Sequence, residues 1–200
     1  MRIFPNGWCD EAAIRPSEHF NERPEGEEIS LLVIHNISLP AGQFGTGDVD
    51  ALFCGTLDCC KHPSYQDLEG LRVSSHFFID RIGRLFQYVS CLDRAWHAGV
   101  SSFEGRENCN DFSIGVELEG TDSTPYERVQ YETLARLTDA LAEAYPIKYV
   151  TGHSMIAPLR KTDPGPAFDW LMYESLCKTG KPLCFERSRP KFCIVGRRLI

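Results

Sequence analysis

The residues with the clearest chemical potential lie in segment 151–166, which reads Thr-Gly-His-Ser-Met-Ile-Ala-Pro-Leu-Arg-Lys-Thr-Asp-Pro-Gly-Pro. It places His153, Lys161 and Asp163 close together in a stretch braced by proline and glycine. A neutral imidazole and a carboxylate are two of the three protein ligands that a catalytic zinc ion requires. The segment therefore predicts part of a metal site, with a positive charge beside it.

The best candidate for the third ligand is His35, which ends the apolar run Ile-Ser-Leu-Leu-Val-Ile-His at residues 29–35. Such a run is typical of a buried strand, which would deliver His35 to the edge of a sheet. Spacing alone does not prove a site, because no local His-Glu-x-x-His signature is present. A core histidine is an equal alternative for His35. For His153 and Asp163 the alternatives are a turn residue and a loop cap, because Asp before Pro is a common turn pair.

Glu117 is the candidate for proton transfer. It lies in an expected strand at residues 113–118, where alternation puts Glu117 and Glu119 on one face and the intervening apolar residues on the other. A carboxylate in an apolar setting suits the transfer of a proton from water to a leaving amine. A surface charge on an edge strand is the alternative, and we assign no catalytic role to Glu119.

The elements that must position these residues predict an α/β fold, a single domain with a central mixed β-sheet flanked by helices. A glycine-containing turn at residues 80–84 predicts that the strands on either side of it are antiparallel neighbours. The expected strands are 29–35, 74–79, 85–89, 113–118 and 149–152.

Two helices are expected in the second half of the chain. The first begins with Thr124 as N-cap, Pro125 at the first helical position and Glu127 completing a capping box, and it ends before Pro146. The second covers residues 167–177. Both helices would cover the sheet that carries the candidate ligands.

Length and composition fit one globular domain, since the chain has 200 residues of which 42% are hydrophobic and 24% are charged. A net charge of −7 argues against a nucleic-acid partner, which normally requires a basic surface. The N-terminus lacks the apolar core of a secretory signal, and no run is long enough to span a bilayer. We therefore expect a cytoplasmic protein with no membrane partner.

The nine cysteines are expected to be free thiols, because their number is odd and nothing directs the chain to an oxidising compartment. A second metal cluster is an alternative for four neighbouring residues, but their spacing matches no familiar zinc knuckle. We interpret them as thiols and an imidazole of a helix and the loop after it: Cys54, Cys59, Cys60 and His62.

The two ends of the chain differ in character from its centre. Residues 1–28 are polar and rich in Pro, Glu and Asn, which predicts an irregular lead-in of the same domain. Residues 29–178 hold all the candidate elements, and residues 179–200 form a basic tail interrupted by proline. This tail fits an ordered edge or a mobile arm, and a solvated terminus is the simpler expectation.

Four segments resemble, in the same order, those of the AmpD-type N-acetylmuramoyl-L-alanine amidases of bacterial cell-wall recycling. They are Leu-Val-Ile-His-Asn-Ile-Ser-Leu-Pro at 32–40, Arg-Ala-Trp-His-Ala-Gly-Val-Ser at 94–101, Cys-Asn-Asp-Phe-Ser-Ile-Gly-Val-Glu-Leu-Glu-Gly-Thr-Asp at 109–122, and residues 152–170. The resemblance implies the fold shared by these amidases and peptidoglycan-recognition proteins. It also implies a monomeric Zn²⁺ enzyme that cleaves 1,6-anhydro-N-acetylmuramic acid from L-alanine of the stem peptide, with a small muropeptide as substrate.

The same resemblance implies a role for each site residue. His35, His153 and Asp163 would bind zinc, Glu117 would transfer protons, and Lys161 would face the developing negative charge. An indole can stack on a sugar and a guanidinium can bind the carboxylates of the stem peptide, so further positions would contact substrate. These are Asn36, Arg72, Trp96 and Arg160. We expect His97 to be a pocket wall or a hydrogen-bonded residue, and His76 to belong to the core.

The chain also departs from the family pattern. Asn108 stands where relatives commonly have arginine, which affects the expected peptide preference unless Arg106 supplies the charge. Peptidoglycan-recognition proteins and phage-type amidases have cysteine where this chain has Asp163, and several of the former only bind wall fragments. Asp163 therefore favours an active enzyme over a non-catalytic muropeptide-binding protein. A broader peptidoglycan amidase is the other alternative, and it would normally require export or a lysis partner.

Overall fold

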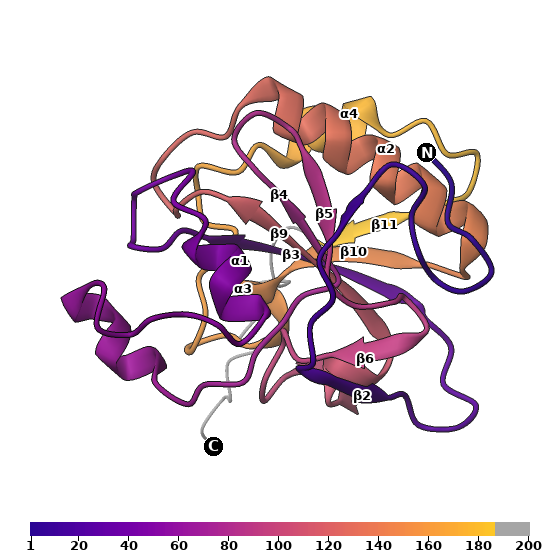
Figure 1. Cartoon of the computed structure of the whole chain (residues 1–200). Coiled ribbons are helices and arrows are strands. Elements are labelled where there is room, and N and C mark those ends of the chain that lie inside the picture. The colour runs from indigo at the N-terminus through magenta and orange to yellow at the C-terminus, as the bar shows by residue number, and fades with distance from the viewer. Residues whose placement is uncertain (187–200) are drawn as a thin grey trace, which may run out of the picture.

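A computed structural model describes residues 1–186 of the chain, and its centre is a seven-stranded mixed sheet (Figure 1). In the described residues the strand order is β1-β5-β4-β9-β3-β10-β11. Five neighbouring strands, β4, β9, β3, β10 and β11, are parallel to one another. β5 is antiparallel to β4, and β1 is parallel to β5. Their bounds are β1 Ala13–Ile14, β3 Leu31–Ile37, β4 Phe77–Ile79, β5 Leu85–Gln87, β9 Ser113–Glu119, β10 Tyr149–Gly152 and β11 Cys184–Glu186.

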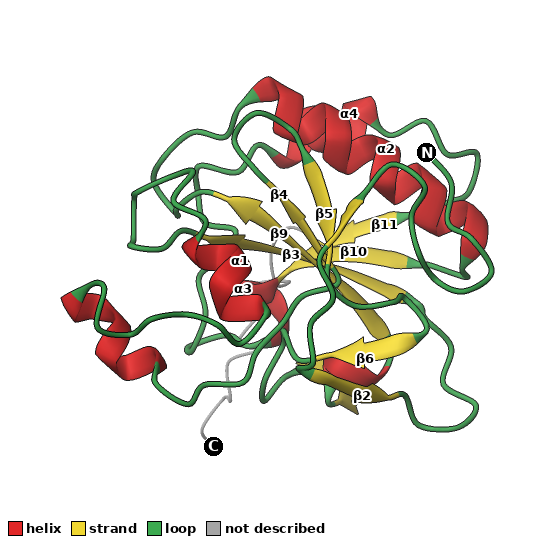
Figure 2. Cartoon of the chain, viewed as in Figure 1, coloured by secondary structure: helices red, strands yellow, loops and turns green. Residues whose placement is uncertain are grey.

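Two short antiparallel pairs lie outside this sheet, and helices cover both of its faces (Figure 2). The pairs are β2 (Phe20–Glu22) with β6 (Asp93–Ala95), and β7 (Ser102–Phe103) with β8 (Arg106–Glu107). The helices are α1 Asp48–Phe53, α2 Arg128–Ala144, α3 His153–Ile156, α4 Trp170–Leu176 and the 3₁₀ helices η1 Pro63–Leu68 and η2 Cys109–Asp111. Among the described residues, no helix is long and apolar enough to cross a membrane.

The central strand β3 alternates between two cores, whereas the apolar side chains of β9 all enter the larger one. One face contributes to a large core under α2 and α4 that includes Ile34, Val116, Leu137 and Tyr173. The other face of β3 contributes to a smaller core that includes Val33, Phe112 and Ile156. Each such side chain stabilises the fold by about 1.5–3 kcal/mol when fully buried, so burial of these side chains fixes the register of β3 and β9.

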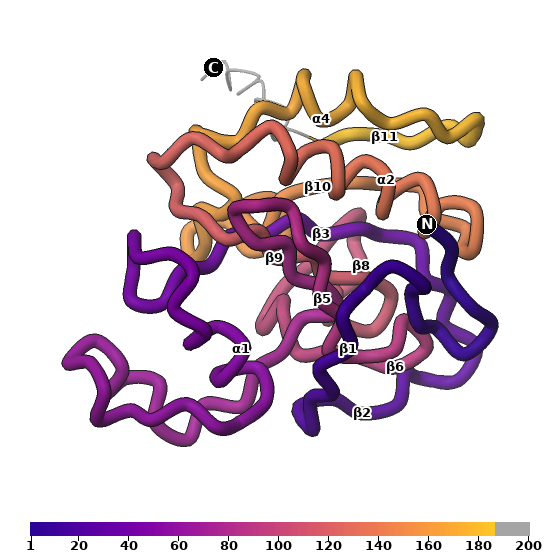
Figure 3. Tube along the Cα trace, turned by 45° about the horizontal axis from the view of Figure 1, so that its top comes forward, coloured from indigo at the N-terminus to yellow at the C-terminus, as the bar shows by residue number. Residues whose placement is uncertain are grey.

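A third cluster forms around α1, where the chain between β3 and β4 extends away from α4 (Figure 3). The buried carboxylate of Asp48 accepts a hydrogen bond from the Tyr65 hydroxyl at 2.8 Å and another from Lys61. Tyr65 lies in η1 and its side chain is fully buried. These contacts fasten the segment that contains η1 to the first turn of α1.

The mixed sheet, the helices around it and the antiparallel pairing of β4 with β5 confirm the sequence predictions. The start of α2 was predicted three residues too early. Glu127 is the N-cap, and the Gln130 side chain accepts from its backbone N–H at 3.0 Å. The Tyr126 hydroxyl instead donates to the carbonyl oxygen of Pro164, which holds the preceding residues outside the helix.

Other predicted boundaries also shift. The strand expected at 74–79 covers only its last three residues as β4, and the helix expected at 167–177 begins at Trp170, where Asp169 caps it. Part of the tail expected to be solvated forms the edge strand β11, which pairs with β10. Residues 187–200 lie outside the described part. The eight described cysteines are free, as predicted.

Candidate metal centre

The predicted metal ligands lie at one edge of the sheet, where three parallel strands end. β3 carries His35, β9 carries Glu117, and β10 leads directly into His153, the first residue of α3. His35 and Glu117 are register partners, and Gly152 pairs with Ile34, so the three side chains become neighbours. The carboxyl ends of parallel strands are the usual place for ligand sites in open α/β sheets.

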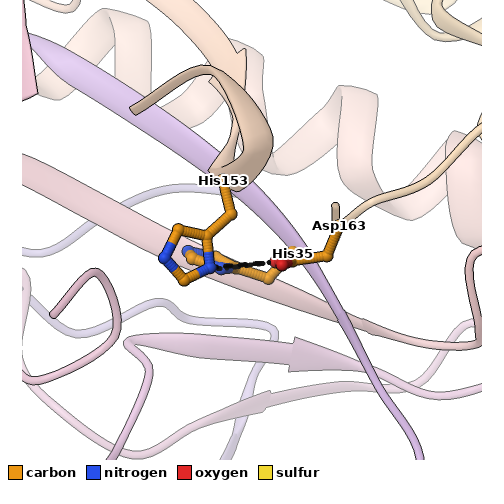
Figure 4. A group of neighbouring side chains, drawn as sticks. All are labelled: His35, His153 and Asp163. Atoms are coloured by element: carbon orange, nitrogen blue, oxygen red, sulfur yellow. Dashed lines mark hydrogen bonds and ion pairs between the residues drawn. The ribbon is translucent and has the colours of Figure 1, made fainter. Parts of the chain in front are cut away.

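His35, His153 and Asp163 point toward one another (Figure 4). The Nδ1 atoms of the two histidines are 2.9 Å apart, and Asp163 Oδ2 lies 3.0 Å from one and 3.1 Å from the other. The histidines are 1% and 3% exposed. Across residues 1–186 this is the one group of His, Cys, Asp or Glu with the spacing of a metal site, so the cysteines near α1 form no second cluster there.

The donor atoms of this group fit a zinc ion. His153 Nε2 lies 3.0 Å from the carbonyl oxygen of Ala98, which can only accept, so Nε2 carries the proton and Nδ1 presents a lone pair. Burial, with a smaller contribution from His153, lowers the pKa of His35 to about 4, which keeps that imidazole neutral. Tetrahedral zinc with bonds of about 2.0–2.1 Å separates its ligand atoms by about 3.3 Å, close to the spacing of these three atoms.

The loop that carries Asp163 is held from several sides. The backbone N–H of Ser154 donates to the carbonyl oxygen of Asp163 at 3.0 Å. The carbonyl oxygen of Pro164 accepts from Asn36 at 3.1 Å and from Tyr126 at 2.8 Å. A Cβ atom at Gly152 would lie 2.7 Å from Pro164 Cδ, so the loop packs where only glycine leaves room.

Glu117 lies beside the three ligands, with its Oε1 atom 4.0 Å from His35 Nδ1. It is 8% exposed, and its buried Oε2 has no hydrogen-bond partner among the described residues. Burial and the charge of Asp163 raise the pKa of Glu117 well above its usual range, while Lys161 opposes the shift. An unpaired carboxylate oxygen next to a ligand set is available to a water molecule.

Lys161 and Arg160 lie on the same loop as Asp163, and both side chains are exposed. The positive charge of Lys161 acts on both His35 and Glu117. Arg160 donates to the carbonyl oxygens of Ala98 at 2.7 Å and Val100 at 2.8 Å. It also lines a surface cavity of about 400 Å³.

The other expected substrate contacts are more dispersed. Asn36 lies next to His35 in β3 and donates to Asp122 and to the Asp163 loop. Trp96 is half-buried, stacks on His19 with ring centroids 6.2 Å apart and donates to Asn21. Arg72 is exposed and lines a cavity of about 250 Å³ together with His19. Their roles in substrate binding stay predictions.

His76 and His97 lie where the sequence predicted. His76 is fully buried and accepts from the backbone N–H of Gly115, and burial lowers its pKa to about 3. His97 is half-buried, and its Nδ1 lies 2.9 Å from His35 Nε2. Burial, with the neighbouring imidazoles, holds the pKa of His97 well below its usual range. Sequence reasoning missed Ala98, because a backbone carbonyl acts without any signature in residue type.

Comparison of the sequence and fold with known proteins shows the family of this chain. The family described as N-acetylmuramoyl-L-alanine amidase matches residues 25–166. The 1,6-anhydro-N-acetylmuramyl-L-alanine amidase AmpD of Citrobacter freundii is 54% identical over 87% of this chain and 94% of its own length. A crystal structure of AmpD superposes with a TM-score of 0.84 at 53% identity, covering 88% of this chain and 99% of the other.

A more distant structure contains a ligand. AmpDh3 of Pseudomonas aeruginosa, in complex with anhydromuramic pentapeptide, gives a TM-score of 0.57 at 30% identity and covers 76% of this chain and 61% of its own. The family match covers most of the chain, and the identity to AmpD extends over nearly its full length. The chain therefore belongs to the N-acetylmuramoyl-L-alanine amidase family, and within it to the AmpD type.

Proposed function

We propose that the chain is a zinc-dependent amidase that hydrolyses the bond between 1,6-anhydro-N-acetylmuramic acid and L-alanine of the stem peptide. The Citrobacter freundii relative carries the name of this activity, and the AmpDh3 complex contains an anhydromuramic pentapeptide. One observation carries the proposal for this chain. Ligand atoms of His35, His153 and Asp163 converge within 3.1 Å, and the carboxylate of Glu117 lies beside them with one oxygen unpaired among the described residues.

Each group in the site has its own role in amide hydrolysis. Zinc, when bound, supplies Lewis acidity that makes water nucleophilic near neutral pH and polarises the amide carbonyl. Glu117 takes a proton from the attacking water and returns it to the nitrogen of L-alanine as the amide bond breaks. Lys161 contributes positive charge where the carbonyl oxygen becomes negative. His35, His153 and Asp163 would hold the ion beside these groups.

The biological setting belongs to the same proposal. We propose that the enzyme is a cytoplasmic monomer that recycles soluble muropeptides released from the wall. The similarity to AmpD over nearly the whole chain supports this setting. A net charge of −7 is consistent with a small soluble substrate rather than a polyanion.

Product analysis by mass spectrometry tests the proposal. The purified protein is incubated with anhydromuramyl-tripeptide as isolated, after chelation, and after zinc is restored. We expect free tripeptide in the zinc-containing samples and none after chelation. Binding without cleavage in the zinc-loaded sample would identify a muropeptide-binding protein instead. Equal cleavage of intact peptidoglycan would identify a broader amidase.

A further inference from the structure

A chain of hydrogen bonds runs from the back of His35 into the core at the start of β9. His35 Nε2 lies 2.9 Å from His97 Nδ1, and His97 Nε2 lies 3.1 Å from Ser113 Oγ. The Ser113 hydroxyl lies 2.5 Å from the carbonyl oxygen of Cys109. Ser113 and Cys109 are fully buried, so these polar groups depend on one another for hydrogen bonds.

The carbonyl oxygen at the end of the chain fixes the direction of every hydrogen bond in it. Because a carbonyl oxygen only accepts, Ser113 donates its one proton to Cys109 and accepts from His97 Nε2. Neutral His97 then has a lone pair on Nδ1, which accepts from the Nε2–H of His35. His35 is left with a lone pair on Nδ1, the atom that faces the other two ligands.

Ala98, the residue after His97, supports the imidazole of His153 in the same way. The carbonyl oxygen of Ala98 accepts from His153 Nε2 at 3.0 Å. The side-chain oxygen of buried Asn110 accepts from the backbone N–H of His97 at 3.2 Å and of Ala98 at 2.8 Å. The acceptors behind both histidine ligands therefore lie on one dipeptide, which a single asparagine holds in place.

β9 is shaped to receive the ring of His97. A Cβ atom at Gly115 would lie 2.5 Å from His97 Cγ, so glycine is required for the ring to fit. Ser113, Gly115 and Glu117 alternate along β9 and share one face. That face provides an acceptor for His97, the space for its ring, and the carboxylate beside His35.

We propose that His97 is a positioning residue, which holds His35 in the tautomer whose Nδ1 lone pair faces the metal. The inference rests on the proposed function, because it takes the three-ligand group to be a zinc site. Outer hydrogen bonds of this kind orient metal-binding imidazoles, and their loss typically weakens metal binding about 10–100-fold. An imidazole is suited to this position because it accepts through Nδ1 and donates through Nε2 at once.

Two substitutions at position 97 separate the acceptor from the packing of the ring. Phenylalanine keeps a ring but accepts nothing, whereas asparagine places a carbonyl oxygen near the position of Nδ1. We expect His97→Phe to weaken zinc binding about 10–100-fold and His97→Asn to recover part of that loss. His19→Phe is the matched control, because His19 forms a hydrogen bond with the carbonyl oxygen of Val73 and not with His35, His153 or Asp163.

Zinc affinity is measured by competition with a chromophoric chelator. Nitrogen-15 NMR of the histidine side chains in the zinc-free wild type gives a second readout, with His35 assigned through His35→Gln, and we expect the proton of His35 on Nε2. Equal zinc affinity in wild type and His97→Phe, or a proton on Nδ1 of His35, would overturn the inference. A wild type that binds no zinc would overturn the proposed function instead, and the NMR result would still decide the tautomer.

Discussion

Glu117 and Glu119 show how two glutamates on one face of a strand come to differ. Both are buried in β9. The two oxygens of Glu119 accept backbone N–H groups of Gly45 and Arg81, at 2.5 and 3.1 Å. Glu117 has an oxygen with no hydrogen-bond partner in the described part of the chain, next to His35. Hydrogen-bond partners rather than burial therefore distinguish Glu117, the proposed proton carrier, from Glu119.

Replacement of Glu117 by glutamine should separate catalysis from metal binding. The amide keeps the shape of the side chain but cannot accept the proton of water, so we expect Glu117→Gln to lower kcat by about 10²–10⁴-fold. Zinc affinity should stay near that of the wild type, because Glu117 is not one of the three proposed ligands. Steady-state kinetics and chelator competition check both results. A variant with near-normal kcat would contradict the role.

Substitution of Lys161 tests how much its positive charge contributes to catalysis. Its side chain is exposed, so Lys161→Met should change the free energy of unfolding by less than about 0.5 kcal/mol. Loss of the positive charge should lower kcat by about 10²–10³-fold, as for removal of one oxyanion donor. Lys148→Met, at another exposed lysine, is the control and should keep wild-type kinetics. Equal kcat in both variants would remove Lys161 from the mechanism.

The grouping of His35, His153 and Asp163 could be predicted from the sequence, because their residue types and the resemblance both point to a shared site. The supports behind them could not. The carbonyl oxygens of Ala98 and Cys109 have no residue-type signature, and His97 lies 62 positions from His35 in the sequence. Only the fold shows that the Trp-His-Ala segment lies behind both imidazoles.

At the scale of elements, the end of β10 sets the position of Asp163. Gly152 is the last residue of β10, and a Cβ atom there would lie 2.7 Å from Pro164 Cδ and 3.3 Å from the carbonyl oxygen of Asp163. The close packing of strand and loop brings the carboxylate to the histidines. One methyl group at this point should therefore disturb the metal site without touching a ligand.

We expect Gly152→Ala to displace the loop and weaken zinc binding by at least about 10-fold, comparable to the loss of an outer-shell contact. Gly180→Ala is the matched control, because nothing lies within 4 Å of a Cβ atom there. Chelator competition on the two variants measures the effect. Wild-type affinity in Gly152→Ala would show that the loop adapts and that this contact does not position Asp163.

The hydrogen bonds of Asp48 with Lys61 and Tyr65 anchor η1 to α1, and they predict how the free energy of unfolding depends on pH. Burial alone would raise the pKa of Asp48, but hydrogen bonds from Lys61 and Tyr65 outweigh it and hold the pKa below its usual value. A carboxyl group with a lowered folded-state pKa stabilises the fold above its unfolded pKa, and this contribution disappears as pH falls through the folded pKa. Asp48→Asn should therefore cost about 1–3 kcal/mol at pH 7.

Denaturant unfolding at several pH values measures this cost. The gap between wild type and Asp48→Asn should be constant above about pH 5 and should narrow below about pH 4, where the wild-type carboxyl becomes protonated. Asp67→Asn, at an exposed aspartate of η1, is the control and should show no such gap. A gap that persists at low pH would mean that the anchor does not depend on the charge of Asp48.

Element boundaries were harder to predict than element types. The apolar run of β3 and the apolar alternation of β9 are local, so the sequence indicates both strands directly. The start of α2 depends on the hydroxyl of Tyr126 reaching Pro164, a contact across 38 positions. Likewise, the shift of residues 184–186 from tail to strand depends on the free edge of β10. Long-range contacts of this kind override local signals.

At the scale of the whole molecule, the metal site exists only when the sheet has formed. His35 and His153 are 118 positions apart and meet because β3 and β10 are parallel neighbours. An unfolded chain cannot hold both imidazoles and Asp163 around one ion, so an ion at this proposed site would bind the folded state and stabilise it by linkage. Metal removal should therefore lower the stability of the entire domain.

We expect zinc at 100 times its dissociation constant to stabilise the protein by about 2.7 kcal/mol. For a chain of this length that corresponds to a rise in Tm of about 5–10 °C over the chelated protein. The His153→Ala variant lacks one ligand, so its Tm should not respond to zinc in the same range. Differential scanning calorimetry with chelator and with zinc measures both shifts. An equal rise in Tm in wild type and His153→Ala would mean that the stabilising ion binds elsewhere in the molecule and not at His35, His153 and Asp163.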